Sequence, residues 1–133
     1  MVSRIKIVAD TNFLFMSIYD EYGKAGKIVK AAVDRKIILF APISVRKELI
    51  VVLKRKYNWN DNEIESEMES LPVKWIDEEL YNSLLSLTTV KHKPDKPVEA
   101  VAILLNCKIL SADTDFKGNE RLMDIDKLLE SLS

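Results

Sequence analysis

The sequence is poor in cysteine, in net charge and in long apolar runs, the features typical of secreted, polyanion-binding and membrane proteins. It contains one cysteine, Cys107, so an intramolecular disulfide is excluded and a reducing environment is expected. Its formal net charge of -1 excludes a general attraction to polyanions, so any contact with nucleic acid must be local. No apolar run approaches the roughly 18 residues of a membrane span. The N-terminal MVSRIKIVADTN has charges where a signal sequence needs an apolar block, so we expect a cytoplasmic protein.

Repeats, low-complexity tracts and linkers are also missing, and the length of 133 residues suits a single core. We therefore predict one domain, residues 1–133. Short segments rich in apolar residues are typical of strands: RIKIVA (4–9), IILFA (37–41), VKWI (73–76) and CKILSA (107–112). Between them, apolar residues recur at helical spacing over 11–19, 24–36, 44–57, 60–71, 78–87 and 98–106, and residues 121–133 suggest a short strand and a short helix. This alternation predicts a three-layer α/β/α fold with a mostly parallel central sheet of four to five strands.

Two of the predicted helices carry start signals. Asn60 stands three residues before Glu63, which predicts a capping box, and Asp77 is placed to cap the helix that follows it.

The segment KILSADTDFKG (108–118) leads from apolar positions straight into Asp113 and Asp115. Like charges held this close repel each other, so such a pair needs a cation, a hydrogen-bond donor or open water beside it. Three interpretations follow: a metal site, an aspartate nucleophile of the phosphatase type, or a solvated turn.

Other carboxylates are expected at the same end of the sheet. In open parallel sheets, functional groups gather beyond the carboxyl ends of the strands, where Asp10 and Asp113 both fall. Asp95 opens the helix that returns to the fourth strand, which brings it toward the same edge. Glu48 falls within an apolar helical stripe near the start of its helix, where a solvated side chain is not expected. Carboxylates that converge without Cys or His favour Mg²⁺ or Mn²⁺, ions that commonly serve phosphoryl transfer.

Each acid also has a purely structural interpretation. Asp10 is suited to cap the following helix, and Asp95 to a cap or turn before Pro97. Glu48 is suited to pair with a neighbouring Lys or Arg. Asp113 and Asp115 are also typical of a solvated turn.

Taken together, these acids and the segments around them resemble the PIN-domain nucleases, and the resemblance covers essentially the entire chain. The segments that carry the resemblance are VADTNFLF (8–15), APISVRKEL (41–49), DKPVEAVAILLNCKILSADTDF (95–116) and DIDKLLE (124–130). It implies a metal site formed by Asp10, Glu48, Asp95 and Asp113, with Asp115 as an auxiliary acid and with Asn12 and Ser111 as polar residues that orient the acids. Ser111 stands where many members have Thr. Glu99 stands where an apolar residue is expected, so it either adds a fifth acid or pairs with Lys96 or another base. The third acid of the site is therefore either Asp95 or Glu99.

What the resemblance implies is a metal-dependent ribonuclease that hydrolyses RNA with Mg²⁺ or Mn²⁺. Stand-alone chains of this size resemble the toxin halves of toxin-antitoxin pairs, which are usually dimeric and inhibited by a small antitoxin protein; RNA processing is the other option. The alternative from another class is a non-catalytic PIN-fold module that binds RNA or protein. Substrate could be steered by KHKPDK (91–96) and by Lys24, Lys27 and Lys30, although clustered lysines more often form a solvated face.

Other interpretations of the Asp113–Asp115 pair are weaker. Phosphatases of the haloacid-dehalogenase type place such a pair after the first strand, whereas only 18 residues follow Asp115 here. An EF-hand loop would put Lys117 at a ligand position and a strand before the loop. A receiver domain would need an acidic pair after the first strand, where VAD offers one acid.

Overall fold

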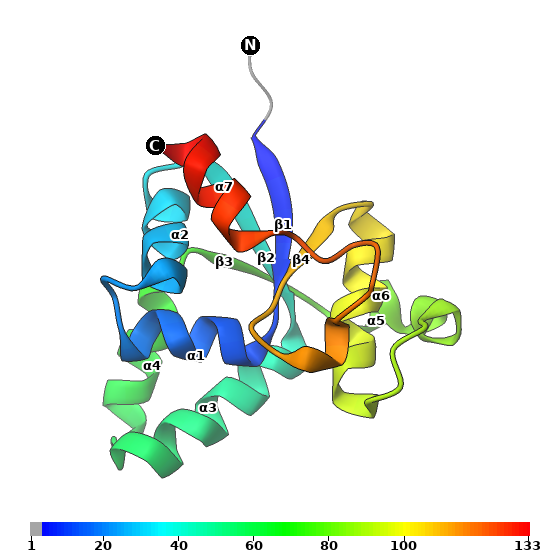
Figure 1. Cartoon of the computed structure of the whole chain (residues 1–133). Coiled ribbons are helices and arrows are strands. Elements are labelled where there is room, and N and C mark those ends of the chain that lie inside the picture. The colour runs from blue at the N-terminus through cyan, green and yellow to red at the C-terminus, as the bar shows by residue number, and fades with distance from the viewer. Residues whose placement is uncertain (1–3) are drawn as a thin grey trace.

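Four parallel strands form the centre of the molecule, in the order β3-β2-β1-β4 (Figure 1). The structure is a computed structural model that describes residues 4–133. The strands are β1 (Ile5–Ala9), β2 (Ile37–Pro42), β3 (Val73–Ile76) and β4 (Lys108–Leu110). All three pairings between neighbouring strands are parallel. The predicted α/β fold with a parallel central sheet is therefore confirmed.

Helices cover both faces of this sheet (Figure 1). They are α1 (Thr11–Tyr19), α2 (Lys24–Val33), α3 (Ile43–Tyr57), α4 (Asp61–Ser70), α5 (Glu78–Tyr81), α6 (Lys96–Leu105) and α7 (Ile125–Leu132), with 3₁₀ segments η1 (Asn82–Leu87), η2 (Lys93–Asp95) and η3 (Thr114–Phe116). Within residues 4–133, no helix combines the length and apolar character that crossing a membrane would need.

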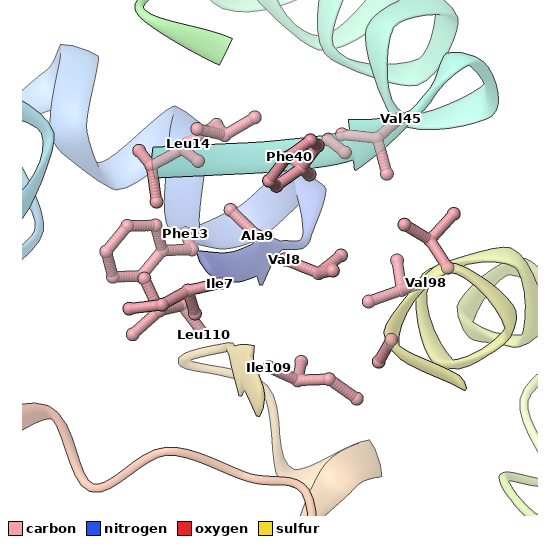
Figure 2. Packing of buried hydrophobic residues seen from close by; sticks show 14 of the residues in the cluster. Ile7, Val8, Ala9, Phe13, Leu14, Phe40, Val45, Val98, Ile109 and Leu110 are labelled. Atoms are coloured by element: carbon pink, nitrogen blue, oxygen red, sulfur yellow. The ribbon is translucent and has the colours of Figure 1, made fainter. Parts of the chain in front are cut away.

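The core lies on both sides of the sheet because successive strand residues point to opposite faces. In Figure 2, Ile7 of β1 lies beside Phe13 of α1, whereas Val8 points toward Val98 of α6. Ile7 and Val8 are both fully buried. Burial of a side chain of this size stabilises the fold by roughly 1.5–3 kcal/mol. The near-continuous apolar sequence of β1 and β2 follows from this two-sided burial.

Strand register brings the ends of β1 and β4 together. Ala9 pairs with Leu110, and the backbone N–H of Asp10 donates to the carbonyl of Leu110 at 3.1 Å. The residues directly after these two strands, Asp10 and Ser111, therefore lie next to each other at one edge of the sheet. Helix α6 ends at Leu105, and the left-handed conformation of the next residue, Asn106 (φ 49°), reverses the chain into β4.

Most helix boundaries follow the sequence pattern, with local differences. The capping box is confirmed, because Asn60 accepts from the Glu63 N–H and Glu63 from the Asn60 N–H. The predicted cap at Asp77 is wrong, because its side chain makes no capping hydrogen bond. The helix predicted over residues 78–87 is a single α-turn followed by the 3₁₀ segment η1. In place of a strand after residue 121, a single bridge joins Leu122 to Ile109.

Candidate functional site

Asp10 is held by hydrogen bonds to both of its carboxylate oxygens. It is the N-cap of α1, where Oδ1 accepts from the backbone N–H of Phe13 at 2.8 Å. Its Oδ2 accepts a hydrogen bond from the hydroxyl of Ser111. Only 3% of the residue is exposed. The structural role of Asp10 as a helix cap therefore exists in the fold, yet it uses only one of the two oxygens.

Burial raises the pKa of Asp10 to about 6, although the hydrogen bonds from Ser111 and Phe13 oppose this rise. The negative charges of Asp95 and Asp113 raise the pKa further. These two acids come from distant parts of the chain, so the fold brings Asp10, Asp95 and Asp113 into one neighbourhood. An acid with a raised pKa in such company is a common feature of functional sites.

Asp95 closes the short segment η2 at the start of α6 and is nearly buried, with 9% of its surface exposed. It makes no capping hydrogen bond to α6. Its Oδ2 instead lies 3.0 Å from Nδ1 of His92. Burial raises the pKa of Asp95 to about 6, the contact with His92 opposes the rise, and Asp115 adds to it. The structural interpretation of Asp95 as a helix cap is therefore not what the fold shows.

Asp113 and Asp115 form a tight turn shortly after the end of β4. Oδ1 of Asp113 accepts from the N–H of Asp115 at 3.1 Å, and its Oδ2 accepts from Nδ2 of Asn12 at 3.1 Å. The N–H of Asp113 in turn donates to the Ser111 hydroxyl at 2.9 Å. Asn12 and Ser111 thus contact the acids directly, and the turn aims Asp115 toward His92.

His92 is the residue at this site that sequence reasoning missed. Its Nδ1 lies 3.0 Å from Asp95 and 3.3 Å from Asp115. His92, Asp95 and Asp115 each offer one ligand atom, and these atoms lie within 4.8 Å of one another, so the group could hold a metal ion. The signal was present, because His92 is the chain's single histidine and precedes Asp95 by three residues. The segment around it had suggested only substrate steering by charge.

The contacts of His92 predict a pH-dependent contribution to stability in the absence of metal. Its hydrogen bond to Asp95, together with the charges of Asp95, Asp115 and Asp113, raises the pKa of His92 above its usual 6.5. The protonated form therefore stabilises the fold below pH 6.5, and this stability is lost as the pH rises through the higher folded-state pKa.

In EDTA, His92→Gln should therefore have a lower Tm than the wild type near pH 6, and the difference should shrink to almost nothing above about pH 8. Thermal unfolding followed by circular dichroism measures it. A Tm difference of the same size at both pH values would show that His92 is not held by charge.

Glu48 differs from the sequence-based expectation. It lies in the second turn of α3, which begins beyond the end of β2 at the same edge of the sheet as Asp10. Its side chain is exposed, whereas Val45 and Leu49 are buried, so Glu48 stands outside the apolar stripe in which the sequence placed it. Among the described residues it makes no hydrogen bond or ion pair, so the expected partner Lys or Arg is also absent. The exposed carboxylate of Glu48 is accessible to a ligand that approaches from solvent.

Glu99 and two lysines of α2 have local partners. Glu99 is buried, and its oxygens accept hydrogen bonds from Thr89, Val90 and Asn119. The expected pairing with Lys96 is not present, because Lys96 donates to the carbonyl of Val90 at 2.9 Å. Lys24 pairs with Asp126, and Lys30 pairs with Asp34, both at 2.8 Å. These two lysines are therefore less available for steering a polyanion than their sequence suggested.

The donor set suits a divalent cation. The negative charges of Asp95 and Asp113 make Asp10 harder to ionise, and a bound cation would offset that repulsion. Oxygen donors favour hard ions such as Mg²⁺ and Mn²⁺, and a single imidazole is compatible with Mn²⁺.

Comparisons with known proteins support the fold. No family model matches the chain, and no curated protein matches it. A chain of a toxin-antitoxin complex from Klebsiella pneumoniae is similar in structure, with a TM-score of 0.63 and 19% sequence identity over 90% of this chain and 97% of that one. A chain of VapBC2 from Rickettsia felis, bound to a DNA fragment from their promoter, gives a TM-score of 0.62 and 16% identity, with coverage of 90% and 96%. At such identities the likeness establishes a shared fold, and activity must be argued from the site.

Proposed function

We propose that this chain is a metal-dependent endoribonuclease of the PIN type, which hydrolyses RNA phosphodiester bonds with Mg²⁺ or Mn²⁺. The observation that carries the proposal is the gathering of four acids from distant parts of the chain. Asp10 and Asp113 both contact the hydroxyl of Ser111. Asp95 and Asp115 both lie within 3.3 Å of Nδ1 of His92. Asp10, Asp95, Asp113 and Asp115 would hold the ion, with Glu48 reaching it or its water from α3. A bound divalent ion supplies an activated water molecule and stabilises negative charge on the phosphate.

The remaining residues orient these ligands. Ser111 and the N–H of Phe13 fix the two oxygens of Asp10, and Asn12 fixes Asp113. Removal of such contacts to ligating groups commonly lowers metal affinity by about tenfold to a hundredfold. His92 balances the charge of Asp95 and Asp115 and is placed to join the ligand set. The exposed Lys91 and Lys93 flank His92 and are suited to contact RNA phosphates.

We further propose that the protein acts as the toxin of a toxin-antitoxin pair in the cytoplasm, as a homodimer inhibited by a small antitoxin. Similarity in fold to chains from two toxin-antitoxin assemblies supports this role. The likeness extends over 97% and 96% of the length of those two chains.

The competing function is a PIN-fold module that binds RNA or protein without cleavage. The exposed position of Glu48 favours this alternative. The raised pKa values of Asp10 and Asp95 argue against it, because a non-catalytic domain would keep an acid cluster that costs stability with nothing to offset it.

An RNA cleavage assay tests the proposed function. Purified protein is incubated with single-stranded RNA in Mn²⁺, in Mg²⁺ and in EDTA, and the products are separated by length. We expect internal cleavage in either ion and none in EDTA. Protein that binds RNA but leaves it intact under all of these conditions, with any co-purifying inhibitor removed, would assign the chain to the non-catalytic class.

Metal binding should also be visible as a gain in stability. A ligand that binds only the folded state stabilises it by RT ln(1 + [L]/Kd), which is about 1.4 kcal/mol when the ion is present at ten times its Kd. The Tm should therefore rise by several degrees when Mn²⁺ or Mg²⁺ is added and return to its starting value in EDTA. Ca²⁺, which prefers more ligands at longer distances, should produce a smaller rise. An unchanged Tm in every ion would contradict the metal site.

A further inference from the structure

Glu99 joins two loops of the candidate site to helix α6. Its Oε1 accepts from the backbone N–H groups of Thr89 at 2.5 Å and Val90 at 3.1 Å. Its Oε2 accepts from the Thr89 hydroxyl at 2.9 Å and from Nδ2 of Asn119 at 3.0 Å. Only 4% of Glu99 is exposed. Although burial opposes ionisation, these hydrogen bonds keep the pKa of Glu99 below its ordinary value, so the carboxylate is charged.

The groups that Glu99 binds belong to the segments that carry the acids. Thr89 and Val90 lie just before His92, and Val90 also receives a hydrogen bond from Lys96 at the start of α6. Asn119 closes the turn that begins with Asp113 and Asp115, since its N–H donates to the carbonyl of Phe116 at 2.9 Å. Asp95 directly precedes α6, one helical turn before Glu99. One buried carboxylate therefore connects the loop of His92, the turn of Asp113 and Asp115, and the helix of Asp95.

We propose that Glu99 is a positioning residue, which sets the distance between the Asp113–Asp115 turn and Asp95 and thereby the metal affinity of the site. It does not itself ligate the ion, because all four hydrogen bonds of its oxygens point to the two loops. An apolar side chain at this place would fill the core equally well but would leave the N–H groups of Thr89 and Val90 without partners. The catalytic part of this inference rests on the proposed function.

The hydrogen-bond chemistry predicts what a single atom change would do. In Glu99→Gln, the remaining oxygen still accepts from Thr89 and Val90, and the new NH₂ group can donate to the Thr89 hydroxyl. It cannot accept from Asn119, and Asn119 cannot turn its amide around because its Oδ1 accepts from the N–H of Arg121 at 2.8 Å. Glu99→Gln therefore releases the Asp113–Asp115 turn while the loop before His92 stays attached.

The same geometry offers a compensating change. In the double variant Glu99→Gln/Asn119→Asp, the NH₂ group of residue 99 donates to one carboxylate oxygen of residue 119, and the other oxygen still accepts from Arg121. The donor and the acceptor are exchanged, and the net charge of the protein is unchanged. Asn119→Asp alone places two carboxylates against each other and should be the most damaging of the three variants.

The experiment measures Mn²⁺ affinity by isothermal titration calorimetry, well below the Tm of every variant, together with kcat and KM for RNA cleavage. We expect Glu99→Gln to weaken Mn²⁺ binding by about tenfold, the lower end of what outer contacts of metal ligands contribute. Its kcat should fall by a similar factor, with little change in KM. The double variant should recover to within about twofold of the wild type.

Ile64→Val provides the control for a general loss of stability. Ile64 is buried on α4, where the substitution removes one methylene from the core away from the acid cluster. It should lower the Tm and leave Mn²⁺ affinity unchanged. Wild-type Mn²⁺ affinity in Glu99→Gln, or a loss that Asn119→Asp does not recover, would overturn the positioning role.

A readout without metal separates this inference from the proposed function. In EDTA, the NMR amide resonances of Asp113 and Asp115 should shift or broaden in Glu99→Gln and return in the double variant. If the wild type binds no ion but these resonances respond, the proposed function fails and Glu99 still sets the turn. Resonances that stay in place would show that Glu99 does not control the turn, whatever the protein does with RNA.

Discussion

Asp113→Asn is expected to lower the rate of RNA cleavage in Mn²⁺ by about a hundredfold or more, which corresponds to about 2.7 kcal/mol of barrier. The substitution removes one negative charge from the proposed ion site while it keeps the size of the side chain. Its oxygen can still accept from the N–H of Asp115, and the exposed Asn12 can turn its amide to accept from the new NH₂ group. Folding should therefore survive, and the loss should be catalytic.

Asp34→Asn is the matched control for this experiment. It makes the same chemical change on an exposed acid at the end of α2, where it removes the ion pair with Lys30. Exposed pairs of this kind contribute little to stability. Cleavage by Asp34→Asn should equal that of the wild type. If Asp113→Asn cleaves RNA as fast as Asp34→Asn, then Asp113 does not hold a catalytic ion.

The arrangement of the acids was predictable where it depends on strand topology. Parallel strands end at one edge, so the placement of Asp10 and Asp113 directly after apolar strands was enough to bring them together. The return path of α6 likewise predicted that Asp95 would lie near them, and its effect on the pKa of Asp10 agrees. These inferences needed only the direction of each element, which hydrophobic periodicity supplies.

What the sequence could not supply was the direction in which individual side chains point. Glu48 lies near the N-terminal end of α3, as expected. Successive residues of a helix are rotated by about 100° around its axis, so the exact position decides whether a side chain faces the core or solvent, and Glu48 faces solvent. Glu99 looked like an unexplained acid because its partners Thr89 and Asn119 stand 10 and 20 residues away in the chain. Contacts between loops at such separations have no periodic signal. For His92, the spacing of three residues from Asp95 was visible in the sequence, but its contact with Asp115 depends on the loop path and was not.

The lengths of elements were least predictable where packing competes with periodicity. The segment Glu78–Leu87 has the apolar spacing of one helix, yet it forms one α-turn and then η1. Asp77 makes no capping bond there, so the α-helix starts without the usual stabilisation of its first N–H groups. The following loop is then fixed from outside, by Glu99 and Lys96 on α6.

Asp10→Asn should stabilise the metal-free protein at neutral pH. The pKa of Asp10 is about 6 in the folded protein against an ordinary 3.8. Because the folded-state pKa is raised, the contribution of Asp10 to stability is complete below pH 3.8 and is lost as the pH rises through about 6. A shift of this size corresponds to a cost of up to about 3 kcal/mol at pH 7, which a neutral side chain would avoid.

The neutral amide also keeps the local structure. Its oxygen can accept from the N–H of Phe13, and its NH₂ group can donate to the Ser111 hydroxyl. In EDTA at pH 7, the free energy of unfolding from urea titration should therefore be higher for Asp10→Asn than for the wild type, and the advantage should shrink as the pH falls toward 4. Adding Mn²⁺ should reverse the order, because the wild type gains an ion that the variant binds poorly. An Asp10→Asn variant that is less stable than the wild type in EDTA would mean that the hydrogen bonds of the charged carboxylate outweigh the cost of burying it. One that keeps the full response to Mn²⁺ would remove Asp10 from the ligand set, because a ligand cannot lose its charge and leave the affinity of the ion unchanged.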